Sequence, residues 1–227
     1  MKPVTCAGIF LLLFATPLLA HHGKDFLSVE SYELPHPKTL YAVSAEELFF
    51  GRGSSTFRDE LSLLFGVTGR MAGEVHAHIE KAPGDSTNVT AIAPAIHLRI
   101  IDSGDLHAGL SAEYEIGRRG AGNAAAVRLI LGRSIEEGAV VGNIGIERIH
   151  GEGTRAIYAI GYRPDMDAAS SWGIEAQGAL RHGERHEAIF AGYRQTTDRL
   201  TVKAGLGVAV GIGKALALIR TGVVWRF

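Results

Sequence analysis

Titratable side chains occupy every second position of residues 74–81, which read EVHAHIEK. The titratable members that alternate with small apolar residues are Glu74, His76, His78 and Glu80. Successive side chains of an extended strand point to opposite faces, so these four share one face. Imidazoles and carboxylates gathered on one face can bind a metal ion, act as acid and base, or line a water-filled passage.

The His-x-His pair gives the metal hypothesis, because two imidazoles on one face of a strand have a spacing that suits chelation. The weak metal candidates are therefore His76 and His78, with Glu74, Glu80 or His97 as a third ligand. The sequence identifies no partner that would orient either imidazole. Histidine also serves simply as a polar residue on hydrated surfaces, so the metal hypothesis stays open.

A hydrolase would need a nucleophile beside a histidine and a carboxylate. If the turn after Thr68 holds three residues, Ser62 lies across from His78, with Glu60 and Glu80 next to them. These are the parts of a catalytic triad, but residue types without geometry do not define one. We expect no enzymatic activity and keep hydrolysis as an alternative.

The elements that position these side chains repeat with a period of two from residue 39 onward. In residues 106–116, for example, Leu, Ala, Leu, Ala, Tyr and Ile alternate with His, Gly, Ser, Glu and Glu. Turns rich in Gly, Pro, Asp and Ser divide the chain into about twelve strands of roughly ten residues. That length crosses a bilayer when a strand is tilted. No segment has the period of an amphipathic helix.

The N-terminus has the pattern of an export signal, with Lys2 before the apolar run at residues 7–19. The run is too short to span a bilayer as a helix. We expect residues 1–20 to be a signal peptide, residues 21–38 a periplasmic segment, and residues 39–227 the β-barrel.

The rest of the composition excludes other classes of protein. The chain has 227 residues and a net charge of −1, which argues against a nucleic-acid binder. Cys6 lies within the signal, so the exported protein would have no disulfide. A free amine followed by His21 and His22 could bind copper, although this ligand set is incomplete.

The two faces of the strands differ in a way that favours a membrane barrel. The apolar face is continuous across nearly all strands, and the other face is rich in Gly, Ser, Arg, Glu and His. The aromatic residues expected near strand ends, as in membrane-interface girdles, are Tyr114, Tyr158, Tyr162, Trp172 and Trp225. A lipid-facing charge near the midplane costs about 2–4 kcal/mol, so charges should sort inward. We predict an all-β, transmembrane, antiparallel up-and-down barrel of about 12 strands in a bacterial outer membrane, as a monomer.

Two stretches of sequence resemble known outer-membrane proteins. Residues 218–227, LIRTGVVWRF, resemble the C-terminal strand whose terminal aromatic, here Phe227, is recognised by the barrel assembly machinery. Residues 32–50 (YELPHPKTLYAVSAEELFF), 63–70 (LLFGVTGR) and 220–227 resemble the outer-membrane family named for the MetA pathway of phenol degradation. The resemblance implies passage of small hydrophobic or aromatic solutes, with outer-membrane lipids and the assembly machinery as partners. Gly69 stands where that family commonly has an acidic residue.

The barrel parity predicts the side chains that face the lumen. The predicted pore-lining residues are Glu74, His76, His78, Glu80, His97, Arg99, His107, Glu113, Arg128 and Arg220. Arg99 should lie across from His107 if the turn at 102–104 holds three residues. Pro94 should mark a bulge or the start of its strand, because it cannot donate to a ladder. The strands near residues 40–50 and 187–195 can be read in either parity.

Strand number leaves two functions open. Twelve strands enclose more than the filled eight-stranded barrels and less than porins of sixteen or eighteen strands. We therefore predict a channel for small solutes, with a largely occluded structural barrel as the alternative. A metal-binding barrel using His76 and His78 and a lipid hydrolase are further alternatives, and no cofactor is expected.

Histidines titrate near neutral pH, so a lumen lined by them should conduct differently between about pH 5 and 8. Planar-bilayer recordings across that window measure the effect. The same current and ion selectivity throughout would remove this hypothesis.

Overall fold

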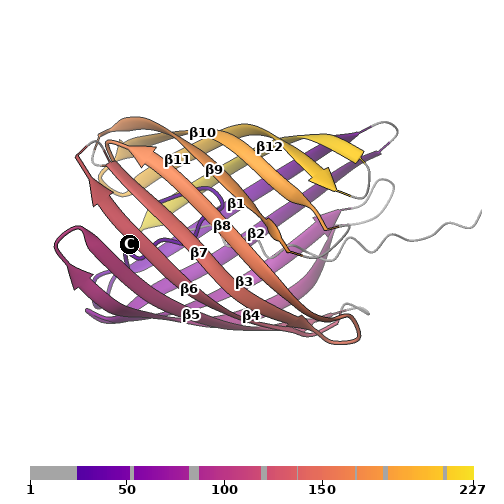
Figure 1. The fold of residues 1–227 in the computed structure, drawn as a ribbon, viewed down its shortest axis with the longest axis horizontal. Helices are drawn as coiled ribbons and strands as arrows, with labels where there is room; N and C mark the ends of the chain where they lie inside the picture. The colour runs from indigo at the N-terminus through magenta and orange to yellow at the C-terminus, as the bar shows by residue number, and fades with distance from the viewer. Residues whose placement is uncertain are drawn as a thin grey trace, which may run out of the picture.

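The computed structural model describes residues 25–51, 54–81, 87–118, 122–136, 138–166, 168–180, 184–211 and 214–227. The expected signal peptide and the histidines at positions 21 and 22 lie outside these residues. The described chain forms twelve antiparallel strands that close into one barrel (Figure 1). The strands are β1 Leu40–Gly51, β2 Ser54–Thr68, β3 Met71–Lys81, β4 Asn88–Ser103, β5 Leu106–Gly117, β6 Ala124–Ile135, β7 Gly138–Ile149, β8 Gly153–Pro164, β9 Ser170–Ala179, β10 His186–Thr197, β11 Leu200–Gly211 and β12 Lys214–Arg226. The predicted fold class is confirmed.

Each strand pairs with its neighbours in the chain, and β1 pairs with β12 to close the ring. The described residues include no helix that is long and apolar enough to cross a membrane. Connections 69–70, 104–105 and 198–199 lie at one end of the barrel. The strand ends that longer stretches of sequence join, such as Lys81 and Asn88 or Gly117 and Ala124, lie at the other. Outer-membrane barrels have short periplasmic turns and longer extracellular loops. We therefore call the two ends periplasmic and extracellular.

The outer surface of the barrel is apolar. Leu61 and Leu63 of β2 are 46% and 51% exposed, whereas Glu60 and Ser62, which alternate with them, are buried. A band of exposed aliphatic side chains around a closed sheet is the surface that hydrocarbon requires. The alternation of apolar outward and polar inward side chains is thus as predicted on this strand.

The aromatic residues follow the predicted girdles in part. Trp225 and Phe227 are exposed at the periplasmic end, and Tyr114 is exposed near the extracellular end of β5. Trp172 stacks on Phe190, with ring centroids 5.8 Å apart. The exception is Tyr158, which lies in the middle of β8 and not at its end.

Two carboxylates on the outer face depart from the predicted sorting of charge. The side chain of Glu47 in β1 points inward and contacts Arg220. Glu46 is its neighbour in the same strand, so its side chain points outward. Glu46 lies across the ladder from Asp59 of β2, and Thr221 Oγ1 donates a hydrogen bond to Glu46 Oε2 at 3.3 Å. The expectation that all charges face inward is wrong here. A period of two sends each neighbour of an inward side chain outward.

Two registers also differ from the sequence prediction. β4 begins at Asn88 and passes through Pro94, which pairs with Val75. The ladder to β5 lacks pairs at Ala93 and Pro94 but keeps its register on either side. Proline has no N–H, so one ladder bond is lost without a bulge. The expectation of a bulge or strand start at Pro94 is wrong.

The turn between β4 and β5 is residues 104–105, shorter than the three residues we expected. The turn pairs His107 with Asp102, and a register shift of one residue between Arg99 and Ile101 then pairs Arg99 with Gly109. The predicted Arg99–His107 pairing is wrong, yet Asp102 joins the two residues. Arg99 Nη1 donates to Asp102 Oδ2 at 2.8 Å, and His107 Nδ1 lies 2.9 Å from Oδ1.

The outward carboxylates give a stability prediction. Arg or Lys on the lipid face near the midplane costs about 2–4 kcal/mol and a carboxylate less, so we expect Glu46→Leu to raise the free energy of unfolding by about 1 kcal/mol. Urea unfolding of the barrel folded into phospholipid vesicles measures this change. Glu47→Leu, which removes an inward carboxylate beside Arg220, should lower the same free energy. A less stable Glu46→Leu barrel would contradict a lipid-facing position.

Candidate functional site

The lumen contains residues 25–32, which we call the plug segment. The side chains of Phe26, Leu27 and Val29 are at most 1% exposed. Figure 1 shows this indigo part of the chain inside the ring of strands. The residues that follow reach the periplasmic end, where Pro37 forms a bridge with Gly66. The plug segment therefore enters the barrel from the end that carries the short turns.

This placement corrects the expected periplasmic segment at residues 21–38. Residues 25–32 lie within the barrel, and residues 21–24 lie outside the described part of the chain. The physical reason is the apolar character of Phe26, Leu27 and Val29, since burying each side chain contributes about 1.5–3 kcal/mol. The lumen offers that burial, and the periplasm does not.

Wall side chains bind the backbone of the plug segment. The amides of Leu27 and Ser28 donate to the two carboxylate oxygens of Glu175, at 2.8 and 2.5 Å. The amide of Glu30 donates to Asn143 Oδ1 at 2.8 Å, and Asn143 Nδ2 donates back to the Glu30 carbonyl at 2.9 Å. A buried segment outside the sheet has backbone groups that need such partners. The wall supplies them.

Cations of the wall complete this binding. Lys203 Nζ donates to the carbonyl of Phe26 at 2.6 Å, and Arg163 Nη1 donates to the carbonyl of Asp25 at 2.8 Å. Arg220, which is fully buried, donates to Ser28 Oγ. Hydrogen bonds from charged groups are about twice as strong as neutral ones. The plug segment is thus held at several points around the wall.

Two inward glycines make room for the aromatic rings of the plug segment. A Cβ atom at Gly132 would lie 2.0 Å from the Tyr32 ring, and one at Gly161 would lie 2.8 Å from the Phe26 ring. The Tyr32 ring stacks on the imidazole of His107, with centroids 4.1 Å apart. Burial raises the pKa of the Tyr32 phenol above its ordinary value. A neutral tyrosine therefore fills this position.

A chain of buried carboxylates and imidazoles connects the wall to the plug segment. His76 Nδ1 lies 3.2 Å from Glu60 Oε1 and 3.5 Å from Glu74 Oε1. His97 Nε2 lies 2.7 Å from Glu74 Oε2, and His97 Nδ1 lies 2.7 Å from Glu30 Oε1. An imidazolium donates from both nitrogens, so it fits the position of His97 between two carboxylates. Three predicted lining residues therefore share one network with Glu30.

The turn between β2 and β3 decides the hydrolase hypothesis. It is residues 69–70, so Ser62 pairs with His76 and not with His78. Ser62 Oγ donates to Glu74 Oε1 at 2.8 Å. The expected Ser62–His78 juxtaposition is wrong for two reasons: the turn is one residue shorter than the hypothesis required, and a register shift between Gly66 and Thr68 moves the partner by one residue more.

The remaining predicted lining residues lie on the inner face in ion pairs. Glu80 lies near the extracellular end, and its Oε1 atom forms an ion pair with Arg58 Nε at 3.0 Å. Glu113 Oε2 accepts from Arg128 Nη1 at 3.4 Å. Arg220 Nη2 donates to Glu187 Oε2 at 2.8 Å. Opposite charges in this lumen are therefore paired, as expected for groups withdrawn from bulk water.

The predicted metal pair does not converge on one point. The rings of His76 and His78 lie 6.2 Å apart, and Nδ1 of His76 faces Glu60. His78 instead lies with Glu113 and Glu115, and these three offer ligand atoms within 4.8 Å of one another. Glu115 lies on β5, two strands away from His78 on β3, so the spacing along one strand could not reveal this cluster.

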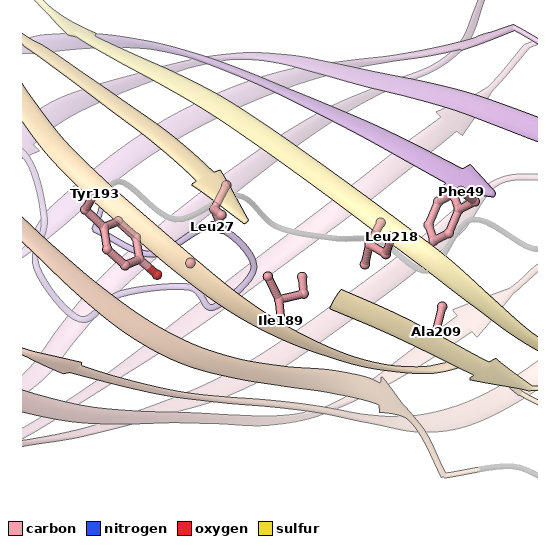
Figure 2. Close-up of a cluster of buried hydrophobic side chains, with 7 residues drawn as sticks. Leu27, Phe49, Ile189, Tyr193, Ala209 and Leu218 are labelled. Carbon is pink, nitrogen blue, oxygen red and sulfur yellow. The ribbon is translucent and has the colours of Figure 1, made fainter. Parts of the chain in front are cut away.

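The inner wall also has an apolar sector, which the sequence prediction missed. It lies on β1, β10, β11 and β12 and packs against Leu27 of the plug segment (Figure 2). Its members are Phe49, Ile189, Ala191, Tyr193, Ala209 and Leu218. The sequence contained one indication of this sector. Apolar residues occur on both faces of β1 and β10, and this is why the inward face of these two strands could not be assigned from the sequence.

Little space remains beside the plug segment. A cavity of about 30 Å³ lies between Ser28 and the wall, lined among others by Arg128, Asn143, Glu147 and Gln177. One water molecule takes up about 30 Å³ in the liquid. This cavity therefore holds about one or two water molecules and no larger solute.

The fold and the two-faced wall define a transmembrane β-barrel of the bacterial outer-membrane type. No family model and no curated protein matches the sequence. Among solved structures, the chain is similar to an outer-membrane channel from Pseudomonas putida F1, with 11% identity, a TM-score of 0.67, and 86% of this chain and 97% of that chain covered. It is also similar to the KdgM porin, with 9% identity, a TM-score of 0.64, and coverage of 82% and 99%. The NanC porin matches with 10% identity, a TM-score of 0.59, and coverage of 82% and 98%. At these identities the likeness shows the fold.

The carboxylate of Glu175 gives a test of the plug segment. Replacing it with an amide weakens two charge-assisted hydrogen bonds, so we expect Glu175→Gln to speed hydrogen exchange at the Leu27 and Ser28 amides about tenfold. Hydrogen–deuterium exchange of the folded barrel, followed by mass spectrometry, measures the exchange rate at these two amides. Glu46→Gln makes the same chemical change on the outer face and should leave both amides unaffected. Equal exchange in the two variants would argue against these bonds.

Proposed function

We propose that this protein is an outer-membrane channel for small solutes, closed in the described conformation by the plug segment. The observation that carries the proposal is the closed ring of strands with an apolar outer face and a charged inner face. The likeness in fold to outer-membrane channels and porins supports it. We further propose that the protein is monomeric, is surrounded by outer-membrane lipids, and is recognised during assembly through the strand that ends at Phe227.

The apolar sector supports a small hydrophobic or aromatic solute. Phe49, Leu218 and Ala209 lie in the extracellular halves of their strands, and the cluster continues to Leu27 of the plug segment. Figure 2 shows Phe49 and Ala209 at one end of this cluster and Leu27 and Tyr193 at the other. These side chains are at most 2% exposed, so an apolar solute entering from outside would reach this surface only after the side chains that cover it move. The sequence resemblance to the phenol-degradation family points to the same class of solute.

Passage requires displacement of the plug segment. Each hydrogen bond to a charged group contributes about 1.5–3 kcal/mol, and the segment has several, so the open state should be a minor one. Loss of about 1.4 kcal/mol of binding raises the open population about tenfold. A variant that weakens the plug segment without changing the wall charge should therefore conduct more.

Gly132→Ala tests the channel. Its Cβ would lie 2.0 Å from the Tyr32 ring, which must move. Loss of a buried aromatic contact costs about 1.5–3 kcal/mol, so we expect at least about a tenfold increase in mean ionic current in planar bilayers. The matched control is Gly192→Ala, whose Cβ would meet the Ala204 carbonyl at an ordinary 3.8 Å.

The small cavity and the paired charges favour an occluded structural barrel as the second candidate. That function predicts no current from the wild type or from either glycine variant, although all three fold. Such a result would overturn the channel proposal. A wild-type current already equal to that of Gly132→Ala would instead show that the plug segment does not close the lumen.

A further inference from the structure

Three polar side chains from two strands meet over a third strand near the extracellular end. His78 lies on β3, and Glu113 and Glu115 lie on β5. β4 runs between them, and its inward side chains at this level are alanines at positions 91, 93 and 95. Alanine is short, so the longer side chains of the flanking strands can lean over β4. Their ligand atoms lie within 4.8 Å of one another.

Glu115 gives an independent reason to expect a ligand. Its side chain is 3% exposed, and among the described residues its Oε2 atom has no hydrogen-bond partner. The closest charged atom recorded for it is His78 Nε2, at 3.9 Å. Burying a carboxylate without a strong partner is costly, and the usual solutions are an ion pair or a metal ion. The carboxylate points into the cluster that His78 and Glu113 complete.

The groups around the cluster are arranged as they are around bound metals. His78 Nδ1 lies 3.7 Å from Glu60 Oε2, which leaves Nε2 directed at Glu115. Glu113 is held through its Oε2 atom by Arg128 at 3.4 Å. Metal-binding histidines commonly have a carboxylate at the second ring nitrogen, and ligating carboxylates are themselves hydrogen-bonded.

We propose that His78, Glu113 and Glu115 bind a first-row divalent transition-metal ion, with Zn²⁺ as the probe. One imidazole and two carboxylates are ligands that Zn²⁺ accepts, with bonds of about 2.0–2.2 Å. Ligand atoms around such a tetrahedral ion lie about 3.4 Å apart, so the cluster must close by at most about 1.4 Å. Rotation of the two glutamate side chains achieves this without moving the strands.

The fourth position of the ion would be open to solvent. The His78 side chain is 14% exposed, and Glu80, two residues further along β3, is 35% exposed. An ion can therefore reach the cluster from the extracellular end without displacing the plug segment. The proposal concerns binding and does not depend on whether the lumen conducts.

The test uses the untagged, folded protein in detergent and isothermal titration with Zn²⁺. We expect one ion per chain, with affinity lowered at least about 100-fold in His78→Gln and in Glu115→Gln. Glu60→Gln leaves the three ligands in place, removes the carboxylate charge behind His78 and beside His76, and should lower affinity about 10–100-fold. Glu46→Gln, the matched change on the outer face, should bind as the wild type does.

Co²⁺ gives a second readout, because its visible spectrum reports ligand geometry. The wild type and Glu46→Gln should show the same tetrahedral bands, and both ligand variants should lose them. Zn²⁺ binding that is unchanged in His78→Gln and Glu115→Gln would overturn the proposal and locate the ion elsewhere, for example at the N-terminal histidines. No binding to a folded wild type would overturn it as well, leaving Glu115 as a buried neutral acid.

Discussion

The pairing of β1 with β12 is the constraint on which the other features depend. Residues 41–50 pair without interruption with residues 217–226, so the ring has no free strand edge. Backbone N–H and C=O groups find no partners in hydrocarbon, and closure satisfies them within the sheet. Closure also seals a space in which inward side chains meet only one another and the plug segment. Arg220 shows the result, since it is fully buried and contacts Glu47 and Glu187 from two other strands.

The same sealed charges explain why the plug segment belongs in the lumen. An empty lumen would have to hydrate Glu175, Arg220 and Lys203 individually, whereas backbone groups and the Ser28 hydroxyl of residues 25–32 give them donors and acceptors. Water entering the lumen could replace these bonds at a net cost of about 1.5–3 kcal/mol each, whereas hydrocarbon offers nothing that could replace the ladder bonds of the wall. The wall is therefore the more permanent of the two, and in the channel that we propose the plug segment is the part that would move.

The sequence predicted which side chains point into the barrel, but it did not predict which residues they contact on other strands. The inward positions of Glu74, His76 and His97 followed from a period of two within single strands. The cross-strand partner of Ser62 depended on a turn one residue shorter than expected and on a bulge between Gly66 and Thr68, which together exchanged His78 for His76. The plug segment had no period to read, and its main anchor, Glu175, lies 148 residues from Leu27 in the sequence. The local pattern of a strand determines which face each side chain is on. Contacts between segments distant in the sequence depend on how the strands close into the ring.

The composition of the plug segment matches the two kinds of inner wall that it touches. Glu30 meets the charged wall through His97 and Ser111, and Leu27 packs into the apolar sector. Moving the segment along the lumen by one residue would bring an apolar side chain to the carboxylates and a polar one to the apolar sector, and both changes are unfavourable. Intermediate positions of the plug segment are therefore unfavourable both at the charged wall and at the apolar sector. In the channel that we propose, the segment should therefore leave as a unit, and the lumen would alternate between one closed and one open state without a graded series between them.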